Sequence, residues 1–169
     1  FEEVNLRFYV VREAEGEVRR GVVFVKEIVP RAAIAMIARR LYGEPYERWR
    51  MPHFRDALHV RYSWEKGDCR NTISVESGAN LGVPAEGSHE EFIIEHYWGY
   101  TKRRGGRTDE YKVEHPKWEL FAAERPHIDV DFGCTYGPEF AFLNEEKPYS
   151  VVLAKGSEIA VYKGKSLNL

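Results

Sequence analysis

The stretch GVVFVKEIVPRAAIAMIARRLYGEPYERWRM, residues 21–51, decides the fold that the rest of the sequence predicts. Residues 22–29 are apolar or β-branched on both alternating faces, and only Lys26 and Glu27 interrupt them. This pattern is typical of a central strand that is covered on both sides. Pro30 ends the predicted strand.

After this strand the spacing of the apolar residues changes. From residue 31 the apolar side chains recur at helical spacing, and Gly43 with Pro45 stops the helix. Residues 46–51 then resume an extended chain. The opening unit is therefore predicted to be strand, helix and strand, with the helix lying over a sheet.

The remaining chain reads mainly as antiparallel hairpins. Alternating segments separated by short turns predict pairs of strands at residues 4–10 with 22–29, 57–65 with 69–77, 92–101 with 108–114, and 151–154 with 159–162. Residues 77–87 are rich in Gly and Pro and are interpreted as a loop. Ser88 and Glu91 form a capping-box pattern with room for one helical turn, after which the chain is predicted to be extended from Phe92.

These elements predict an α+β fold that is mostly antiparallel β. Closure into a barrel-like sheet is favoured because closure removes exposed strand edges. A single domain is expected over residues 1–169. Because the chain begins at Phe1 and enters a strand pattern at once, an N-terminal portion is expected to be missing.

Composition excludes several classes of function. With 43% hydrophobic residues and a formal charge of −2, the chain has a core but no basic face for nucleic acid. No stretch approaches the roughly 20 apolar residues of a membrane span. Cys69 and Cys134 have no CxxC spacing, so neither a zinc site nor a disulfide is indicated. Reduced thiols in a cytoplasm are the prediction.

The segment EHYWGY, residues 95–100, is the main candidate for chemistry. His96 is a candidate acid or base on an aromatic strand face, with Glu95 or Tyr97 orienting a substrate. The alternative is an aromatic core strand whose histidine satisfies a hydrogen bond. Arg39 is a candidate for binding a carboxylate, although a cation at a helix end also complements the helix dipole.

Motifs for metals and cofactors are missing from the sequence. It contains no HExxH, no nucleophile elbow of the GxSxG type, no Walker loop and no GxGxxG fingerprint. We therefore predict neither a metal nor a cofactor.

Three segments together resemble a known family. EVNLRFYV (residues 3–10), the opening unit, and EHYWGYTKRRGG followed by YKVEHPKWEL (residues 95–106 and 111–120) resemble the uncharacterised YqjF-like family, a bacterial domain of unknown function. That family is related to the acetoacetate decarboxylase superfamily. The resemblance implies a closed, mostly antiparallel β-barrel around an internal cavity, with one main helix after the second strand.

The resemblance also implies where catalytic lysines would stand. In the decarboxylases a lysine pair follows a proline after the equivalent helix, and one lysine forms a Schiff base with the keto acid. Here Pro45 is followed by Tyr46 and Glu47, so Schiff-base chemistry is not expected at this position. Lys26 is the alternative amine in the unit.

Three functions stay open at this point. The first is a cavity-containing protein that binds a small carboxylic or keto acid, or an enzyme of unassigned reaction. Its candidate catalytic residues are His96 and Glu47, and its candidate binding residues are Tyr46, Tyr97, Arg39 and Lys26. The second is a structural or protein-interaction module that forms a homo-oligomer through strand edges. The third is a decarboxylase-like enzyme that uses Lys26.

Overall fold

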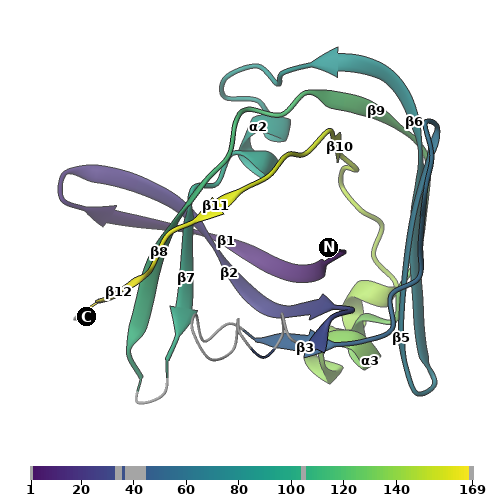
Figure 1. Ribbon diagram of the computed structural model, residues 1–169, viewed down its shortest axis with the longest axis horizontal. Helices are drawn as coiled ribbons and strands as arrows, with labels where there is room; N and C mark the ends of the chain where they lie inside the picture. The colour runs from purple at the N-terminus through teal and green to yellow at the C-terminus, as the bar shows by residue number, and fades with distance from the viewer. Residues whose placement is uncertain (1, 33–35, 37–44, 104–105, 168–169) are drawn as a thin grey trace. The chain divides into compact units, whose positions relative to one another are not determined.

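The computed structural model describes residues 2–32, 36, 45–103 and 106–167 (Figure 1). They divide into two compact units with one sheet each. The seven-stranded unit comprises the described residues of Glu3–Arg48, Ala85–Lys117 and Ser157–Leu169, and the five-stranded unit comprises those of Phe1–Glu2, Trp49–Pro84 and Trp118–Gly156. The single domain expected from the sequence stays a prediction.

The seven-stranded sheet has the order β1-β2-β7-β8-β11, with β3 beside β2 and β12 beside β8. Its strands are β1 (Val4–Ala14), β2 (Glu17–Val29), β3 (Tyr46–Arg48), β7 (Trp98–Lys102), β8 (Thr108–Glu114), β11 (Ala160–Val161) and β12 (Lys165–Leu167). β2 runs parallel to β3 and β7, and the other pairs are antiparallel. The sheet thus forms around β2, the strand at the start of the quoted stretch.

The hairpin of β1 and β2 places the polar residues of the later site on one face. Its turn has positive φ at Glu15 (54°) and Gly16 (79°), as a two-residue type I′ hairpin requires. Tyr9 lies opposite Val22 and Arg7 opposite Phe24. Because alternate residues of a strand share a face, Arg7 and Tyr9 point to the same side of the sheet.

The five-stranded sheet is antiparallel throughout, with the order β10-β9-β6-β5-β4. Its strands are β4 (His53–Arg55), β5 (His59–Lys66), β6 (Cys69–Gly82), β9 (Leu120–Asp129) and β10 (Leu153–Ala154). After β9 the chain forms the short helix α3 (Phe132–Tyr136) and the 3-10 helix η1 (Pro138–Asn144). The hairpin predicted at residues 66–68 is confirmed.

The predictions for residues 77–87 and for the last hairpin are wrong. Residues 77–82 are not loop but the end of β6, where register shifts let this Gly-containing segment pair with β9. Residues 151–154 and 159–162 do not pair with each other, because β10 pairs with β9 and β11 with β8. Both errors arise because a strand finds its partner far away in the sequence.

The mostly antiparallel α+β architecture is confirmed, but the closed barrel is not. Neither sheet of the described residues closes on itself. The helix predicted after Pro30 and the candidate Arg39 fall largely or wholly outside the described residues.

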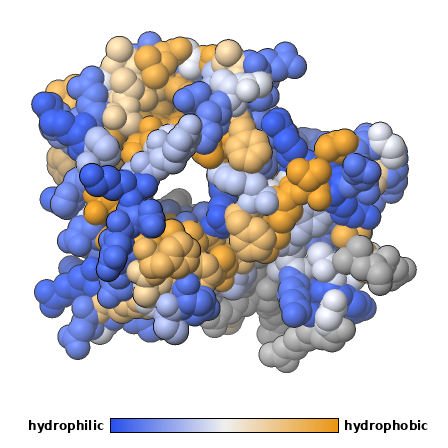
Figure 2. Space-filling view, turned by 180° about the vertical axis from the view of Figure 1, so that it is seen from behind, coloured by the Kyte–Doolittle hydropathy of each residue, from blue (hydrophilic) through white to orange (hydrophobic). Residues whose placement is uncertain are grey.

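Each sheet has its own buried side chains. Ile28, Val29 and Tyr100 are buried in the seven-stranded unit, and Trp64 and Leu120 in the five-stranded unit. Large hydrophobic side chains also remain exposed, and hydrophobic areas alternate with hydrophilic ones in Figure 2. Among the helices of the described residues, none has the length and apolar character to cross a membrane.

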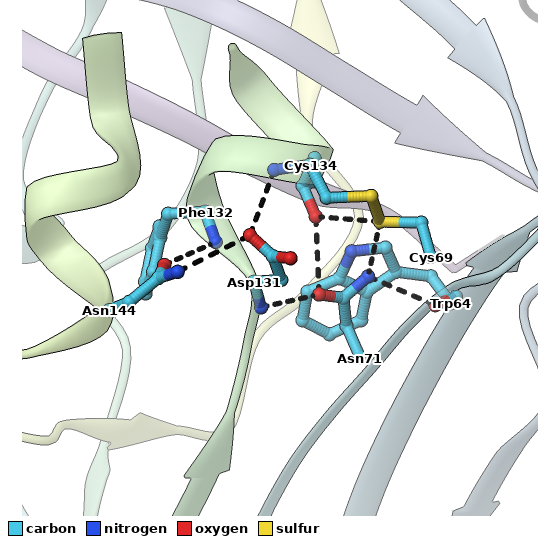
Figure 3. Close-up of a disulfide and its surroundings, with 8 residues drawn as sticks. Trp64, Cys69, Asn71, Asp131, Phe132, Cys134 and Asn144 are labelled. Atoms are coloured by element: carbon cyan, nitrogen blue, oxygen red, sulfur yellow. Dashed lines mark hydrogen bonds between the residues drawn. A yellow bond between two sulfur atoms is a disulfide. The ribbon is translucent and has the colours of Figure 1, made fainter. Parts of the chain in front are cut away.

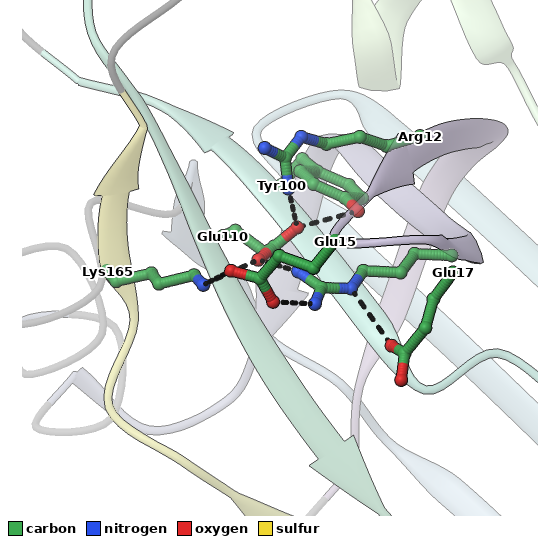
Figure 4. Close-up of polar contacts among 7 residues, drawn as sticks. Arg12, Glu15, Glu17, Tyr100, Glu110 and Lys165 are labelled. Carbon is green, nitrogen blue, oxygen red and sulfur yellow. Dashed lines mark hydrogen bonds and ion pairs between the residues drawn. The ribbon is translucent and has the colours of Figure 1, made fainter.

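A buried charge cluster joins three parts of the seven-stranded sheet (Figure 4). The side chain of Glu110 on β8 is fully buried, and it accepts hydrogen bonds from Arg19 (2.8 Å), Arg12 (2.7 Å) and Tyr100 (3.0 Å). The Lys165 ammonium on β12 lies 3.8 Å away. Burial, reinforced by Glu110, raises the pKa of Tyr100 to about 12, which keeps its phenol protonated as a donor.

The two cysteines are not reduced thiols, so that prediction is wrong. A disulfide joins Cys69 at the start of β6 to Cys134 in α3 (Figure 3), and their Cα atoms are 6.1 Å apart. This distance lies in the usual range for a disulfide. The sequence contained no sign of the pair because 65 residues separate its members.

Candidate functional site

The candidate site lies at the segment that joins helix α2 to strand β7. Helix α2 (His89–Ile94) begins as the capping-box pattern predicted, because the Ser88 hydroxyl accepts from the Glu91 amide at 3.1 Å. The prediction of a strand from Phe92 is wrong, since the helix continues to Ile94 and β7 begins only at Trp98. His96 therefore stands on a connection and not on a strand face.

The His96 side chain is packed among aromatic rings in the seven-stranded unit. It is 8% exposed, and its ring centroid lies 4.5 Å from that of Tyr9 and 5.4 Å from that of Phe92. Within the described residues neither ring nitrogen makes a hydrogen bond of full geometry, although the Ile93 carbonyl interacts weakly with the ring. A buried imidazole without such a bond is unusual, because buried polar atoms are normally satisfied.

Burial and two arginines together keep this imidazole neutral. Burial first, then the positive charges of Arg7 and Arg20, lower the pKa of His96 to about 4, against a smaller opposing effect of the Ile93 carbonyl. His96 is thus neutral at pH 7, with one nitrogen able to donate and the other able to accept. Arg7 itself donates to the Ile93 carbonyl at 3.2 Å, and Arg20 lies 3.6 Å from Glu91.

Next to His96, the buried Glu95 and the partly buried Tyr97 form a hydrogen-bonded pair. Glu95 is 3% exposed, and its Oε2 accepts a hydrogen bond from the Tyr97 hydroxyl. Its Oε1 makes no hydrogen bond within the described part of the chain. Burial, followed by the hydrogen bond to Glu95, raises the pKa of Tyr97 to about 12. The Tyr97 ring stacks on His115, with centroids 5.0 Å apart.

Tyr46 occupies another part of the same sheet face. β3 pairs with β2 so that Tyr46 lies opposite Glu27, and Glu27 lies opposite Asn5. The Tyr46 hydroxyl donates to Glu3 at 3.1 Å, and Asn5 donates to the other Glu3 oxygen at 3.0 Å. Burial and the carboxylates of Glu3 and Glu27 raise the pKa of Tyr46, so its phenol remains protonated.

Glu47 and Lys26 lie on the opposite face. Their side chains form an ion pair with an N to O distance of 3.2 Å, and each is partly exposed. Because successive strand residues point to opposite sides, Tyr46 and Glu47 cannot line one surface of β3. The structure therefore brings Lys26 and Glu47 together and places them away from Tyr46.

The sequence reasoning missed the two arginines and Tyr9. Arg7 and Tyr9 stand at the polar positions of an alternating strand, which normally face solvent. Helix α2 packs beside these positions, as the contacts of Phe92 and Ile93 show. A pattern of alternation shows which face is polar but not which later segment covers it.

In the described part of the chain, neither a metal cluster nor the groove of the five-stranded unit is a stronger candidate than the region around His96. Within the described ranges no group of three His, Cys, Asp or Glu side chains is arranged to hold a metal ion. An open groove of about 480 Å³ lies on the five-stranded unit beside Phe54 and Arg61. Its other charged groups are paired, His59 with Asp56 and Arg125 with Glu76. Four of the charged side chains of this groove therefore already form ion pairs, which makes it a weaker candidate than the region around His96.

Comparison with solved structures defines the class of fold. A structure of acetoacetate decarboxylase matches with a TM-score of 0.52 and 11% sequence identity, over 92% of this chain and 66% of that chain. This likeness concerns the fold. The chain spans about two thirds of the length of that protein.

The sequence itself assigns the family. Residues 1–158 match the family model of domain of unknown function 2071, described as an uncharacterized conserved protein, and the chain belongs to this family. The predicted membership is confirmed, and the fold is similar to that of acetoacetate decarboxylase, as predicted. No curated protein sequence matches the chain.

Proposed function

We propose that the seven-stranded unit binds a small carboxylic acid, with keto acids among the candidates, at Arg7, Arg20 and His96. One observation carries the proposal. A neutral, almost fully buried imidazole has no hydrogen bond of full geometry at either nitrogen within the described residues, only a weak interaction with the Ile93 carbonyl, and it is influenced by the positive charges of two guanidinium groups. Such a group is poised for a ligand that is itself polar and negatively charged.

The chemistry of the three side chains fits a carboxylate with a neighbouring carbonyl. A guanidinium presents parallel donors that match the two oxygens of a carboxylate. The side chain of Arg20 is 39% exposed, and its ion pair with Glu91 is long, at 3.6 Å. A ligand carboxylate can therefore take the place of Glu91 beside Arg20. The neutral His96 then has a donor for a carbonyl oxygen.

We assign no reaction to this site. His96 and Glu47 were the predicted catalytic residues, but Glu47 pairs with Lys26 on the other face of β3. Tyr97 and Tyr46 stay predicted binding groups that these contacts do not support, because each phenol already donates to a carboxylate, Tyr97 to Glu95 and Tyr46 to Glu3. The proposal includes an enclosed cavity that holds the acid, as the resemblance to the decarboxylase fold implies.

Calorimetric titration with acetate, pyruvate and levulinate tests the binding. Arg7→Gln and Arg20→Gln should each weaken binding by about 10-fold or more, because a charge-assisted hydrogen bond contributes about 1.5–3 kcal/mol. Arg70→Gln, the same change at an exposed position of β6, should leave binding unchanged. Equal affinities in all four proteins, or no binding of any of the acids, would refute the proposal.

The decarboxylase alternative requires a nucleophilic amine at Lys26. In this structure the Lys26 ammonium is held in an ion pair with Glu47, which a Schiff base would have to break. Borohydride trapping with acetoacetate or pyruvate should leave Lys26 unlabelled. A covalent adduct on Lys26 would establish the alternative instead.

The non-catalytic alternative predicts a different result. An interaction module that associates through strand edges should form oligomers in size-exclusion chromatography and bind none of the acids. The predicted cytoplasmic location also stays a prediction. Disulfides persist mainly in oxidising compartments, and in the cytosol they are usually transient, so the Cys69–Cys134 bond bears on that prediction.

A further inference from the structure

We propose that Cys134 is a site of reversible modification by low-molecular-weight thiols, through exchange with its disulfide to Cys69. The site lies in the five-stranded unit and is independent of the proposed acid-binding site. The two sulfurs have different surroundings. Cys134 is exposed on α3, whereas Cys69 is only 8% exposed at the start of β6.

The buried sulfur has neighbours that suit a leaving thiolate. Asn71 Nδ2 donates toward Cys69 Sγ at 3.7 Å (Figure 3). The Thr135 hydroxyl also lies 3.7 Å from this sulfur. The hydroxyl donates to Asn71 Oδ1 at 3.2 Å while the disulfide is closed, and its single proton can rotate from there toward a sulfur that becomes negative. Hydrogen-bond donors stabilise a thiolate, and a more stable thiolate leaves faster in exchange.

The exchange step follows from this asymmetry. A thiolate from solution attacks the exposed Sγ of Cys134, the bond between the two protein sulfurs breaks, and its electron pair departs on Cys69 Sγ. The product is a mixed disulfide on Cys134. A second thiol then attacks the sulfur of the small molecule, releases a small disulfide and leaves two protein thiols, so the protein gains two electrons and two protons.

Hydrogen bonds hold α3 in place when the disulfide is open. Asn71 Oδ1 accepts from the Asp131 amide at 2.9 Å. Asp131 in turn accepts from the Cys134 amide at 2.9 Å and from Asn144 at 3.3 Å. Because these bonds do not depend on the disulfide, the exchange opens a modification site in a chain that stays folded.

Peptide mapping of the native protein tests the proposal. The wild type is treated with excess glutathione, quenched with an alkylating reagent and analysed by mass spectrometry. The mixed disulfide should be found on Cys134. An adduct mainly on Cys69, or adducts only after denaturation, would overturn the proposal.

Two matched variants test the asymmetry directly. Oxidised glutathione should label Cys69→Ser, which keeps Cys134, about 10-fold faster than Cys134→Ser, which keeps Cys69, because thiol access controls the rate. In denaturant the two proteins should react at the same rate. Equal rates in the native proteins, with circular dichroism showing both folded, would contradict the proposed difference.

Discussion

At the scale of single residues, His96 should make stability depend on pH. Burial and two arginines hold its folded pKa near 4, below the 6.5 of an unperturbed imidazole. Between these values the unfolded chain binds more protons than the folded one, so stability rises with pH. The contribution of the neutral His96 to the free energy of unfolding is complete above about pH 6.5 and is lost as the pH falls through about 4.

Between pH 7 and pH 4.5 the wild type should lose on the order of 1–2 kcal/mol of its free energy of unfolding. The loss is limited to this size because the surroundings relax around a charged imidazole. Urea unfolding of the wild type and of His96→Gln at pH 7 and pH 4.5 measures it. The variant should lose less stability than the wild type between the two pH values. His127→Gln, at an exposed position of β9, should behave like the wild type. Identical pH dependence in all three proteins would contradict the assignment.

Sequence reasoning identified some site residues and misplaced others. His96 and Tyr97 stood out because titratable groups lie among aromatics, and both have strongly shifted pKa values. Tyr46 and Glu47 were predicted to line one site, although neighbouring residues on a strand face opposite sides. Arg7 was missed because its position in a strand does not reveal which helix packs against it.

At the scale of elements, Glu110 ties the β1–β2 hairpin to β7 and β8. Glu110→Gln should destabilise the protein by about 3 kcal/mol, because it leaves two arginines beside a neutral side chain in a buried cluster. Glu114→Gln is the matched change on the same strand, at an exposed position, and should have little effect. Thermal unfolding compares them. Similar melting temperatures for the two variants would show that the cluster does not stabilise the sheet.

The parallel contact between β2 and β7 depends on a glycine. A Cβ atom at Gly21 would lie 2.6 Å from the Tyr100 ring and 2.8 Å from the Trp98 carbonyl oxygen. Gly21→Ala should therefore cost about 1–3 kcal/mol, because a backbone oxygen cannot move aside as a flexible side chain can. Chemical denaturation measures this cost. An unchanged unfolding midpoint would mean that the two strands can separate without loss.

Elements with strong turn signals were predictable, and elements without them were not. The turns at Glu15–Gly16 and at residues 66–68 fixed two hairpins from local sequence. β10 and β11 have two residues each, and their partners lie on β9 and β8. Such short strands carry too little periodicity to indicate a partner. Their pairing depends on the rest of the sheet.

At the scale of the whole molecule, the chain contains two units with different covalent constraints. The disulfide lies within the five-stranded unit and spans 65 residues. A cross-link over such a loop stabilises the folded state by up to about 4 kcal/mol, because it restricts the conformations of the unfolded chain. Reduction should therefore increase amide hydrogen exchange in α3 and β6, and leave β7 and β8 unchanged. Equal increases in both units would show that they unfold together.

The fold class and the family were predictable from the whole sequence, although individual pairings were not. Order and spacing of three segments indicated the family that the comparison then confirmed. Closure into a barrel was not borne out by the sheets of the described residues, because strand count alone does not determine where the edges of a sheet meet. The disulfide depended on a fold that brings residues 69 and 134 together.

The Glu110 cluster has a consequence for the order of events during synthesis. Arg19 leaves the ribosome 91 residues before the carboxylate that it meets in the finished sheet. At about 5–20 residues per second, the β1–β2 hairpin must wait several seconds for β7 and β8. Until then its arginines remain hydrated and its free edge remains open to other chains. The nascent protein is therefore expected to be most dependent on chaperones before Glu110 emerges.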